Sequence, residues 1–297
     1  MLSSLLALLA GPPFLIDYDG VPPEAERAFA EAAAIWSDCL VTGVPVRARV
    51  TWIDRGPTGF AYPRLVDGQD LPVQDAWYPA ALANALRGER DADAADFHVF
   101  LQGGDDRYYG AASGIAEGQT DFVNVSLHEI AHGLGVATAT FVPWDGEPVA
   151  SLGLPNEFVS YFDFAFDLPE FDGTPFLYDT FLTLADGRTL ADFENPSLAL
   201  TKALANPTLH FAGPDATAAN DSYPVAVTPL SVSHIPAMPR QPTPIMLSNS
   251  GRDESVRTLD PILLGMMADL GWEIAPAWFK AAKAARSPSR PAGSGAE

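Results

Sequence analysis

Two histidines four residues apart constrain this chain more than any other feature of its sequence. Residues 125–138 read VSLHEIAHGLGVAT, which contains the pattern HExxH with Glu129 beside the first histidine. On an α-helix, residues four apart lie on one face, so His128 and His132 would direct both imidazoles at one metal ion. The pattern therefore predicts a helix whose polar face meets an opening.

The flanking residues support a helix over 120–134. Thr120 or Asp121 is a suitable N-terminal cap, and Gly133 and Gly135 are natural terminators, since glycine adopts a left-handed backbone without steric cost. An apolar stripe recurs at spacings of four, three and four residues, formed by Val123, Leu127, Ile130 and Leu134. The stripe, the cap and the glycines agree with the motif, which a chance match would not require.

The residue types of this motif are those of a zinc centre. A catalytic zinc takes three protein ligands and one exchangeable water, whose pKa it lowers from 15.7 to about 7. We expect His128 and His132 to be two of the ligands and Zn²⁺ to be the cofactor. Glu129, one position round the helix, is the predicted catalytic base that takes the proton of that water.

The third ligand is not on this helix. The motif continues as HExxHxxGxxT, so Thr138 stands where the compact metzincin peptidases place a third histidine, and a hydroxyl is a poor zinc ligand. Three other histidines remain, His98, His210 and His234. His98 lies in an apolar strand pattern, where we expect a core or sheet-face role, and His210 has no supporting context.

His234 is the preferred third ligand. It begins the proline-rich stretch SHIPAMPRQPTPIMLS, in which Met246 follows on a segment that can return beneath a metal. Glu157, in NEFVS, is the rival, because gluzincin peptidases take a glutamate ligand from a similar setting. The glycines that close the helix after His132 argue against Glu157, but this alternative stays open.

Hydrophobic periodicity predicts both helices and strands. Residues 21–40 have a pair of prolines at their start and then repeat apolar side chains at the helical period. Residues 260–271 form a capped helix that ends at a glycine. Residues 44–53 alternate apolar and polar side chains, and residues 97–101 form another strand. Residues 139–230 are irregular, which indicates loops with short helices. The predicted fold class is α+β.

Composition excludes several classes of partner. The chain has 297 residues, a net charge of −21 and a pI near 4.4, so neither nucleic acid nor an anionic membrane surface is an expected partner. Cys39 is the only cysteine, which excludes an intrachain disulfide and a cysteine metal cluster. No apolar run approaches the roughly 20 residues of a membrane-spanning helix. Residues 1–12 fit either the remnant of an export signal or a first buried strand.

Several blocks of the sequence resemble one family. LHEIAHGLG, followed much later by SVSHI and then IMLS, is similar to the leishmanolysin-like metzincins, zinc metallopeptidases with a long insertion before the third histidine. More closely, it is similar to secreted bacterial zinc peptidases of this type. Other blocks occur in the same order, among them IWSDCLVTGVPVRARVTW, WYPAALANAL, FAGPDATAAN and DPILLGMMADLGW. The resemblance covers most of residues 13–273.

This resemblance implies a specific site. Zinc would be bound by His128, His132 and His234, with Glu129 as general base and Met246 as the methionine of the turn beneath the metal. The chain reads SHIPAMP where a Trp-Asp pair often follows the histidine in the relatives. Met238 is therefore a weaker alternative for the turn methionine.

The implied fold has two lobes, a twisted mixed sheet with the zinc helix and an irregular C-terminal lobe. An extended peptide would lie along the upper edge strand of the sheet. The expected division of the chain is 1–12 as an export-signal remnant, 13–138 as the N-terminal catalytic subdomain, 139–275 as the C-terminal subdomain, and 276–297 as a largely disordered tail.

The expected function is that of a zinc-dependent endopeptidase, secreted or periplasmic and monomeric, with peptides or proteins as substrates. A zinc-dependent hydrolase of a non-peptide amide or ester is the first alternative, since the same water and base serve any acyl carbon. A catalytically inactive peptide-binding relative is the second, and the presence of Glu129 argues against it.

Overall fold

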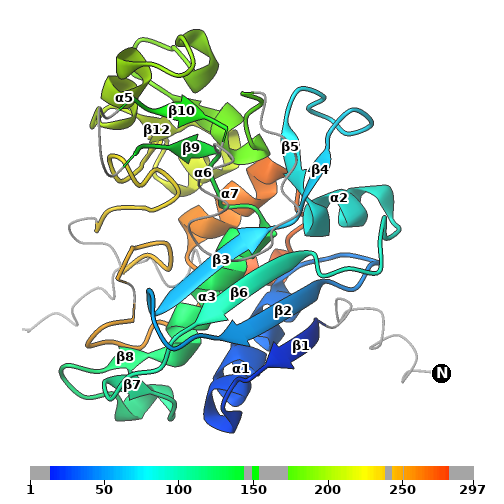
Figure 1. Ribbon diagram of the computed structural model, residues 1–297, viewed down its shortest axis with the longest axis vertical. Coiled ribbons are helices and arrows are strands. Elements are labelled where there is room, and N and C mark those ends of the chain that lie inside the picture. The colour runs from blue at the N-terminus through cyan, green and yellow to red at the C-terminus, as the bar shows by residue number, and fades with distance from the viewer. Residues whose placement is uncertain (1–13, 144–148, 154–172, 238–242, 250, 281–297) are drawn as a thin grey trace, which may run out of the picture.

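The computed structural model describes residues 14–143, 149–153, 173–237, 243–249 and 251–280. Over these residues the chain is a mixed α+β structure, as its periodicity predicts. Figure 1 shows the main sheet and α1 (Pro23–Cys39) at one end of the molecule, with α5 (Leu198–Leu204) and the small strands around it at the other. The candidate metal helix, α3 (Phe122–Leu134), lies between them.

The main sheet is mixed. In spatial order it consists of β1 (Leu15–Asp19), β2 (Arg47–Trp52), β6 (Phe97–Leu101) and β3 (Gly59–Pro63). β1 and β6 run parallel to β2, whereas β3 is antiparallel to β6 and ends the sheet. The alternation seen in the sequence decides the buried face, because Ala48 and Val50 point inward while Arg49 is exposed.

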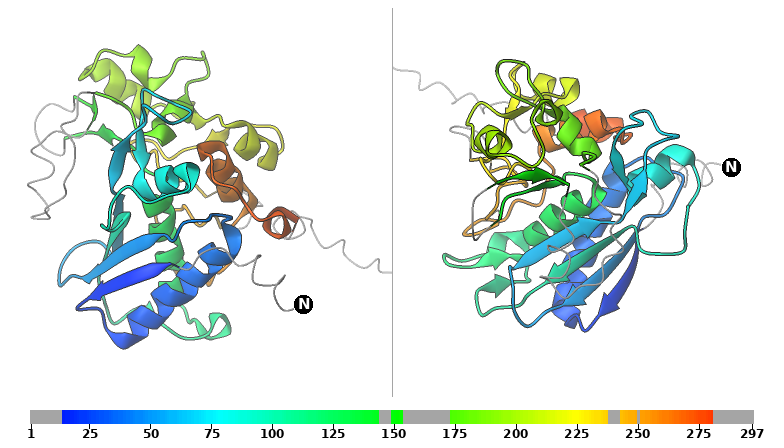
Figure 2. Two further views of the ribbon diagram at one scale, coloured as in Figure 1. Left: turned by 90° about the vertical axis from the view of Figure 1, so that its right-hand side faces the viewer. Right: turned by 45° about the horizontal axis from the view of Figure 1, so that its top comes forward.

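Helices α1 and α3 cover the inner face of this sheet (Figures 1 and 2). They pack against each other, and the indole Nε1 of Trp36 in α1 donates a hydrogen bond of 3.2 Å to the carbonyl of Leu127 in α3. The lone cysteine, Cys39, is fully buried at the end of α1, and burial raises the pKa of its thiol to about 12. A buried neutral thiol fits a packing role rather than a reactive one.

The ends of α3 follow from local chemistry. Asp121 caps the helix, since its carboxylate accepts a hydrogen bond of 2.9 Å from the amide of Val123. Gly135 ends it with a φ of 129°, as the sequence predicts. Gly133 was expected to end the helix as well, and this is wrong. It lies inside α3, where a Cβ atom would approach Cγ of Phe97 to 2.4 Å, so Gly133 permits close packing of the helix on β6.

Shorter elements complete the described fold. The remaining strands are β4 (Leu65–Asp67), β5 (Trp77–Pro79), β7 (Arg107–Tyr108), β8 (Thr120–Asp121), β9 (Thr140–Phe141), β10 (Ser151–Leu152), β11 (Leu182–Thr183), β12 (His210–Phe211) and β13 (Val225–Ala226). Further helices are α2 (Ala80–Arg87), α6 (Pro214–Ala219), α7 (Pro261–Leu270) and the 3₁₀ turns η2 (Ala112–Gly114), η3 (Leu177–Phe181) and η4 (Leu190–Asp192). Residues 276–280, the last that are described, are helical as well. These short pieces after α3 agree with the irregular pattern of residues 139–230.

Helix α7 and the segment that follows it connect the C-terminal part of the described chain to α3. Asp260 caps it and Gly271 ends it in a left-handed conformation, both as expected. Just beyond it, the indole of Trp272 donates a hydrogen bond of 2.9 Å to the carbonyl of Leu134, the last residue of α3. The fold therefore fixes α3 at both ends.

Some predicted features fall outside the described residues. They are residues 1–12, Glu157, Met238 and residues 281–297 of the tail. None of the described helices is both long and apolar enough to cross a membrane.

Candidate metal centre

Helix α3 and a distant loop bring three histidines together. His128 and His132 lie on one face of α3, as their spacing predicts, and His234 comes from the segment after β13. One ligand nitrogen from each lies within 4.8 Å of the others. The ring centroids of His128 and His132 are 4.7 Å apart, and that of His234 is 5.1 Å from each. The three imidazoles are therefore close enough to bind one metal ion.

Hydrogen bonds to the Nδ1 atoms fix the orientation and the tautomer of two of these rings. The Nδ1 atom of His128 lies 2.7 Å from the carbonyl oxygen of Ile245, and that of His132 lies 2.6 Å from the carbonyl oxygen of Val136. A carbonyl only accepts, so each Nδ1 carries the proton and each neutral ring leaves a lone pair on Nε2.

The two Nε2 atoms lie 3.0 Å apart. In the neutral rings neither of these atoms has a proton to donate to the other, so their lone pairs repel at this distance. A shared cation removes this repulsion, and a metal ion is the cation that imidazole lone pairs bind. The geometry of the pair thus fits a metal ligand set.

His234 is held in place by its own loop and by the Met246 segment. Its Nδ1 atom lies 2.8 Å from the hydroxyl oxygen of Ser231. The amide of Ile235, the next residue, donates a hydrogen bond of 2.8 Å to the carbonyl of Met246. Met246 is fully buried, and its neighbour Ile245 is the partner of His128. The turn at 244–247 is therefore hydrogen-bonded both to His128 and to the residue after His234. The role of Met246 beneath the metal stays a prediction.

Burial keeps the three imidazoles neutral. It lowers the pKa of His128 to about 4, with a smaller contribution from the charge of His234. Burial also lowers the pKa of His132 well below its ordinary value, aided by His128, and lowers the pKa of His234. Metal binding needs neutral imidazole, so at neutral pH all three rings are in the form that binds a metal.

Glu129 lies beside the triad but is not one of its members. Only 5% of its surface is exposed, and among the described residues its Oε2 atom has no hydrogen-bond partner. Burial raises the pKa of its carboxyl to about 8. A buried acceptor without a partner is costly, and at functional sites it commonly marks a group that acts on a ligand.

The edge strand β3 passes directly over this carboxylate. A Cβ atom at Gly59 would approach Oε1 of Glu129 to 2.4 Å, so any larger residue there would have to displace the side chain of Glu129. Sequence reasoning missed Gly59, because nothing local distinguishes GFAYP from any other strand that begins with glycine. Its role follows only from the approach of β3 to α3.

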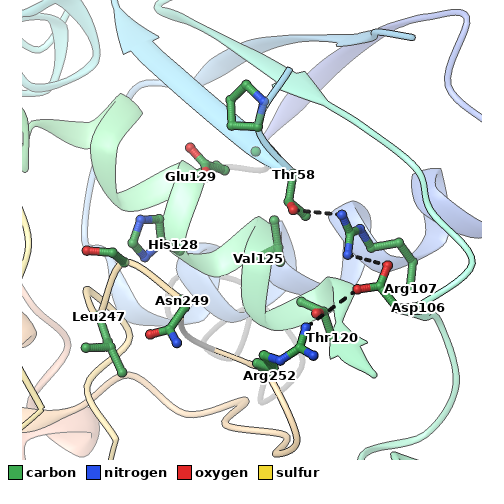
Figure 3. A pocket seen from close by; sticks show the side chains of 13 residues that line it. Thr58, Asp106, Arg107, Thr120, Val125, His128, Glu129, Leu247, Asn249 and Arg252 are labelled. Carbon is green, nitrogen blue, oxygen red and sulfur yellow. Dashed lines mark hydrogen bonds and ion pairs between the residues drawn. The ribbon is translucent and has the colours of Figure 1, made fainter. Parts of the chain in front are cut away.

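Two pockets meet at Glu129 and His128. The first, which we call the arginine pocket, has a volume of about 420 Å³ and lies toward the N-terminus of α3 (Figure 3). The two pockets share five lining residues, and Thr58, Asp106, Arg107, Asn249 and Arg252 are among those that line the arginine pocket alone. The second, which we call the tyrosine pocket, has a volume of about 360 Å³ and lies toward the C-terminus of α3. Beside the three histidines it is lined by Phe60, Tyr62, Ala137, Thr138 and Ser233.

Thr138 does not complete the metal site. Its hydroxyl bonds to the carboxylate of Asp179, which also accepts hydrogen bonds from the amides of Ala139 (2.8 Å) and Phe176 (3.0 Å). Asp179 is fully buried, and burial raises its pKa to about 6 in spite of these bonds. This carboxylate fixes the loop that leaves α3, and no pattern in the sequence predicts its role.

The remaining histidines lie in strands. His98 is a half-buried residue of β6 that pairs in register with Arg49 and Tyr62, which agrees with the expected sheet-face position. His210 lies in β12, and neither histidine belongs to a described group of metal-binding side chains.

Comparisons with protein-family models, with curated proteins and with solved structures each found no match to this chain.

Proposed function

We propose that this protein is a zinc-dependent endopeptidase of the leishmanolysin-like metzincin type. One observation carries the proposal. Three neutral imidazoles converge beside a buried carboxylate, Glu129, that has no hydrogen-bond partner among the described residues. Three ligands and a nearby base that is not a ligand are the composition of a catalytic zinc site rather than a closed structural one.

The donor set supports zinc as the metal. Imidazole nitrogens suit zinc and other transition metals, whereas calcium and magnesium take oxygen ligands. Two nitrogens at about 2.0–2.1 Å from a tetrahedral zinc are about 3.3 Å apart. The 3.0 Å between Nε2 of His128 and Nε2 of His132 is close to that spacing.

His128, His132 and His234 would hold the zinc, which would supply Lewis acidity to polarise the scissile carbonyl and to acidify a water. Glu129 would take the proton of the attacking water and return it to the leaving amine. Its position suits both steps, because the carboxyl lies beside the three histidines and lines both pockets.

Strand β3 is suited to hold the substrate. It ends the main sheet, and residues 59–62 line the tyrosine pocket next to Glu129. An extended peptide that added to this edge would form backbone hydrogen bonds with β3 and would bring its scissile carbonyl over α3. Gly59 permits this close approach, since any side chain at that position would meet Glu129.

The substitution Glu129→Gln tests the mechanism. The amide keeps the size of the side chain but cannot act as a base, so we expect normal zinc content and a loss of turnover of at least about a hundredfold. Zinc is measured by elemental analysis and turnover with denatured casein. Glu117→Gln, at an exposed carboxylate, is the matched control and should leave both unchanged. Proteolysis that survives in the Glu129→Gln variant would refute the role of Glu129.

A further inference from the structure

The two pockets beside Glu129 differ in charge. Among the described residues that line the tyrosine pocket, the ionisable groups are those of the metal centre and Tyr62. The arginine pocket adds two guanidinium groups, from Arg107 and Arg252, and one carboxylate, from Asp106. This local excess of positive charge stands out in a chain of net charge −21.

The two arginines are bound differently. Arg107 is largely buried, with 11% of its side chain exposed, and donates hydrogen bonds to Asp106 (2.7 Å) and to the hydroxyl of Thr58 (2.8 Å). Figure 3 shows this group at the wall of the pocket, with Asp106 between the two arginines. The carboxylate of Asp106 is therefore compensated by Arg107, and Arg107 is a structural part of the wall.

The guanidinium of Arg252 has N–H donors that other described residues do not use. Its nearest carboxylate oxygens belong to Asp106, at 3.8 Å, and to Asp253, at 3.9 Å, both beyond hydrogen-bond distance. No hydrogen bond from this guanidinium to another described residue is formed, and half of the side chain, 51%, is exposed. Exposed ion pairs at such distances are weak, so they do not neutralise Arg252.

The backbone of Arg252 is nevertheless fixed. Arg252 forms an antiparallel bridge with Thr120 in β8, the strand that leads into α3. The flanking residues close the ladder, because the amide of Asp121 donates to the carbonyl of Gly251 (2.9 Å) and the amide of Asp253 donates to the carbonyl of Gln119 (2.8 Å). The side chain therefore starts from a rigid base at the mouth of the pocket.

We propose that the arginine pocket binds a carboxylate of the substrate next to the bond that is cleaved, and that Arg252 determines this specificity. The inference rests on the proposed peptidase function and deepens it. Guanidinium groups bind carboxylates through paired, charge-assisted hydrogen bonds. The carboxylate belongs either to an aspartate or glutamate side chain or to the C-terminus of a peptide. The opposite side of the cleft, the tyrosine pocket, accepts uncharged side chains.

Matched peptide pairs test this specificity by binding, separately from turnover. Fluorescent peptides with Glu or Gln at each position around the cleaved bond are titrated against the zinc-loaded Glu129→Gln protein, and the fluorescence anisotropy is recorded. We expect about tenfold tighter binding of one Glu peptide than of its Gln partner at low salt. Peptides with a free or an amidated C-terminus distinguish the two sources of the carboxylate.

Two further variants in this background locate the effect. Arg252→Gln should reduce the Glu preference to less than about twofold, and Arg252→Glu should reverse it in favour of a Lys peptide. Arg188→Gln, at an exposed arginine that pairs with Asp186, is the matched control and should keep the full preference. The same ratios should appear in kcat/KM when Glu129 is intact.

The outcomes separate this inference from the proposed function. Equal binding of all Glu and Gln pairs and of both C-terminal forms, or a preference that survives Arg252→Gln, would overturn the inference even if peptides are cleaved. Failure to cleave any peptide would refute the proposed function. In that case the binding ratios would still decide whether the arginine pocket recognises a carboxylate.

Discussion

At the scale of single residues, hydrogen bonds outside the triad decide what the triad can bind. The carbonyl groups of Ile245 and Val136 hold the protons of His128 and His132 on Nδ1, so both lone pairs point toward the space shared with His234. Such partners orient ligands and raise their basicity in metal sites generally. Residues outside the triad therefore orient two of its three imidazoles in the way that metal binding requires.

Metal content of three alanine variants tests the ligand set. His234→Ala removes one of three imidazoles, and we expect zinc content after dialysis to fall to well below half of one equivalent. His210→Ala is the matched histidine control in strand β12 and should keep a full equivalent. Glu157→Ala should keep it too. A full equivalent of zinc in His234→Ala, together with loss of zinc in Glu157→Ala, would show that Glu157 is the third ligand in place of His234.

The site could be predicted from the sequence only in part. His128, Glu129 and His132 could be predicted from their spacing alone, because the geometry of a helix sets the positions of these three side chains relative to one another. His234 was preferred through its context and a family resemblance, and the structure places it beside the other two. Gly59 and Arg252 were missed, since each acts through a contact with a segment far away in the chain.

At the scale of elements, local patterns predicted the long helices and two strands of the main sheet, β2 and β6, but not β1 and β3. Helix α1 lies at Pro23–Cys39, within the predicted range, and β6 lies at the predicted residues 97–101. The strands of two residues, such as β7, β8 and β12, were not predicted. Each of these strands is defined by its pairing with another segment. Two residues are too few to show the alternation of apolar and polar side chains that identifies a strand in the sequence. The subdomain boundaries stay predictions.

Gly133 provides a test of how α3 packs on the sheet. Alanine is the better helix former, so helix propensity alone would make Gly133→Ala stabilising by roughly 1 kcal/mol. The added methyl, however, would approach Cγ of Phe97 to 2.4 Å. We therefore expect overpacking to dominate and the free energy of unfolding to fall by about 1–3 kcal/mol, measured by urea denaturation.

The control for Gly133→Ala is a glycine without neighbours. A Cβ atom at Gly43 meets nothing within 4 Å, so Gly43→Ala should change the free energy of unfolding by less than about 0.5 kcal/mol. An unfolding midpoint of Gly133→Ala equal to or above that of the parent would show that α3 does not press on β6 as described.

At the scale of the whole molecule, one buried carboxylate connects the metal helix to the region that follows it. Asp179, in η3, accepts hydrogen bonds from Thr138 and Ala139 at the exit of α3 and from Phe176 on its own side. The connection has an electrostatic cost, since burial raises the pKa of Asp179 from 3.8 to about 6. The ionised carboxylate is therefore less favourable in the folded chain than in the unfolded one.

This cost makes the stability of the whole chain depend on pH. Between pH 3.8 and about 6 the folded state binds more protons at Asp179 than the unfolded state does, so this carboxyl lowers the free energy of unfolding as the pH rises through that window. Asp179→Asn removes the effect, because the amide does not titrate. Relative to the parent, the variant should gain about 2–3 kcal/mol between pH 4 and pH 7, at 1.36 kcal/mol for each pKa unit.

Urea denaturation at four pH values between 4 and 7 measures this gain, and contributions from other titrating groups cancel in the difference between the two proteins. Asp186→Asn is the matched control. Asp186 is exposed, and its hydrogen bond to Arg188 lowers its pKa below 3.8, so it is mostly ionised in both states at pH 4 and almost fully ionised in both above about pH 5. Its difference from the parent should change little with pH, and in the opposite direction to that of Asp179→Asn. A difference for Asp179→Asn that is equally flat would mean that Asp179 is not held ionised in a buried site, and that the exit of α3 is joined to η3 by some other contact.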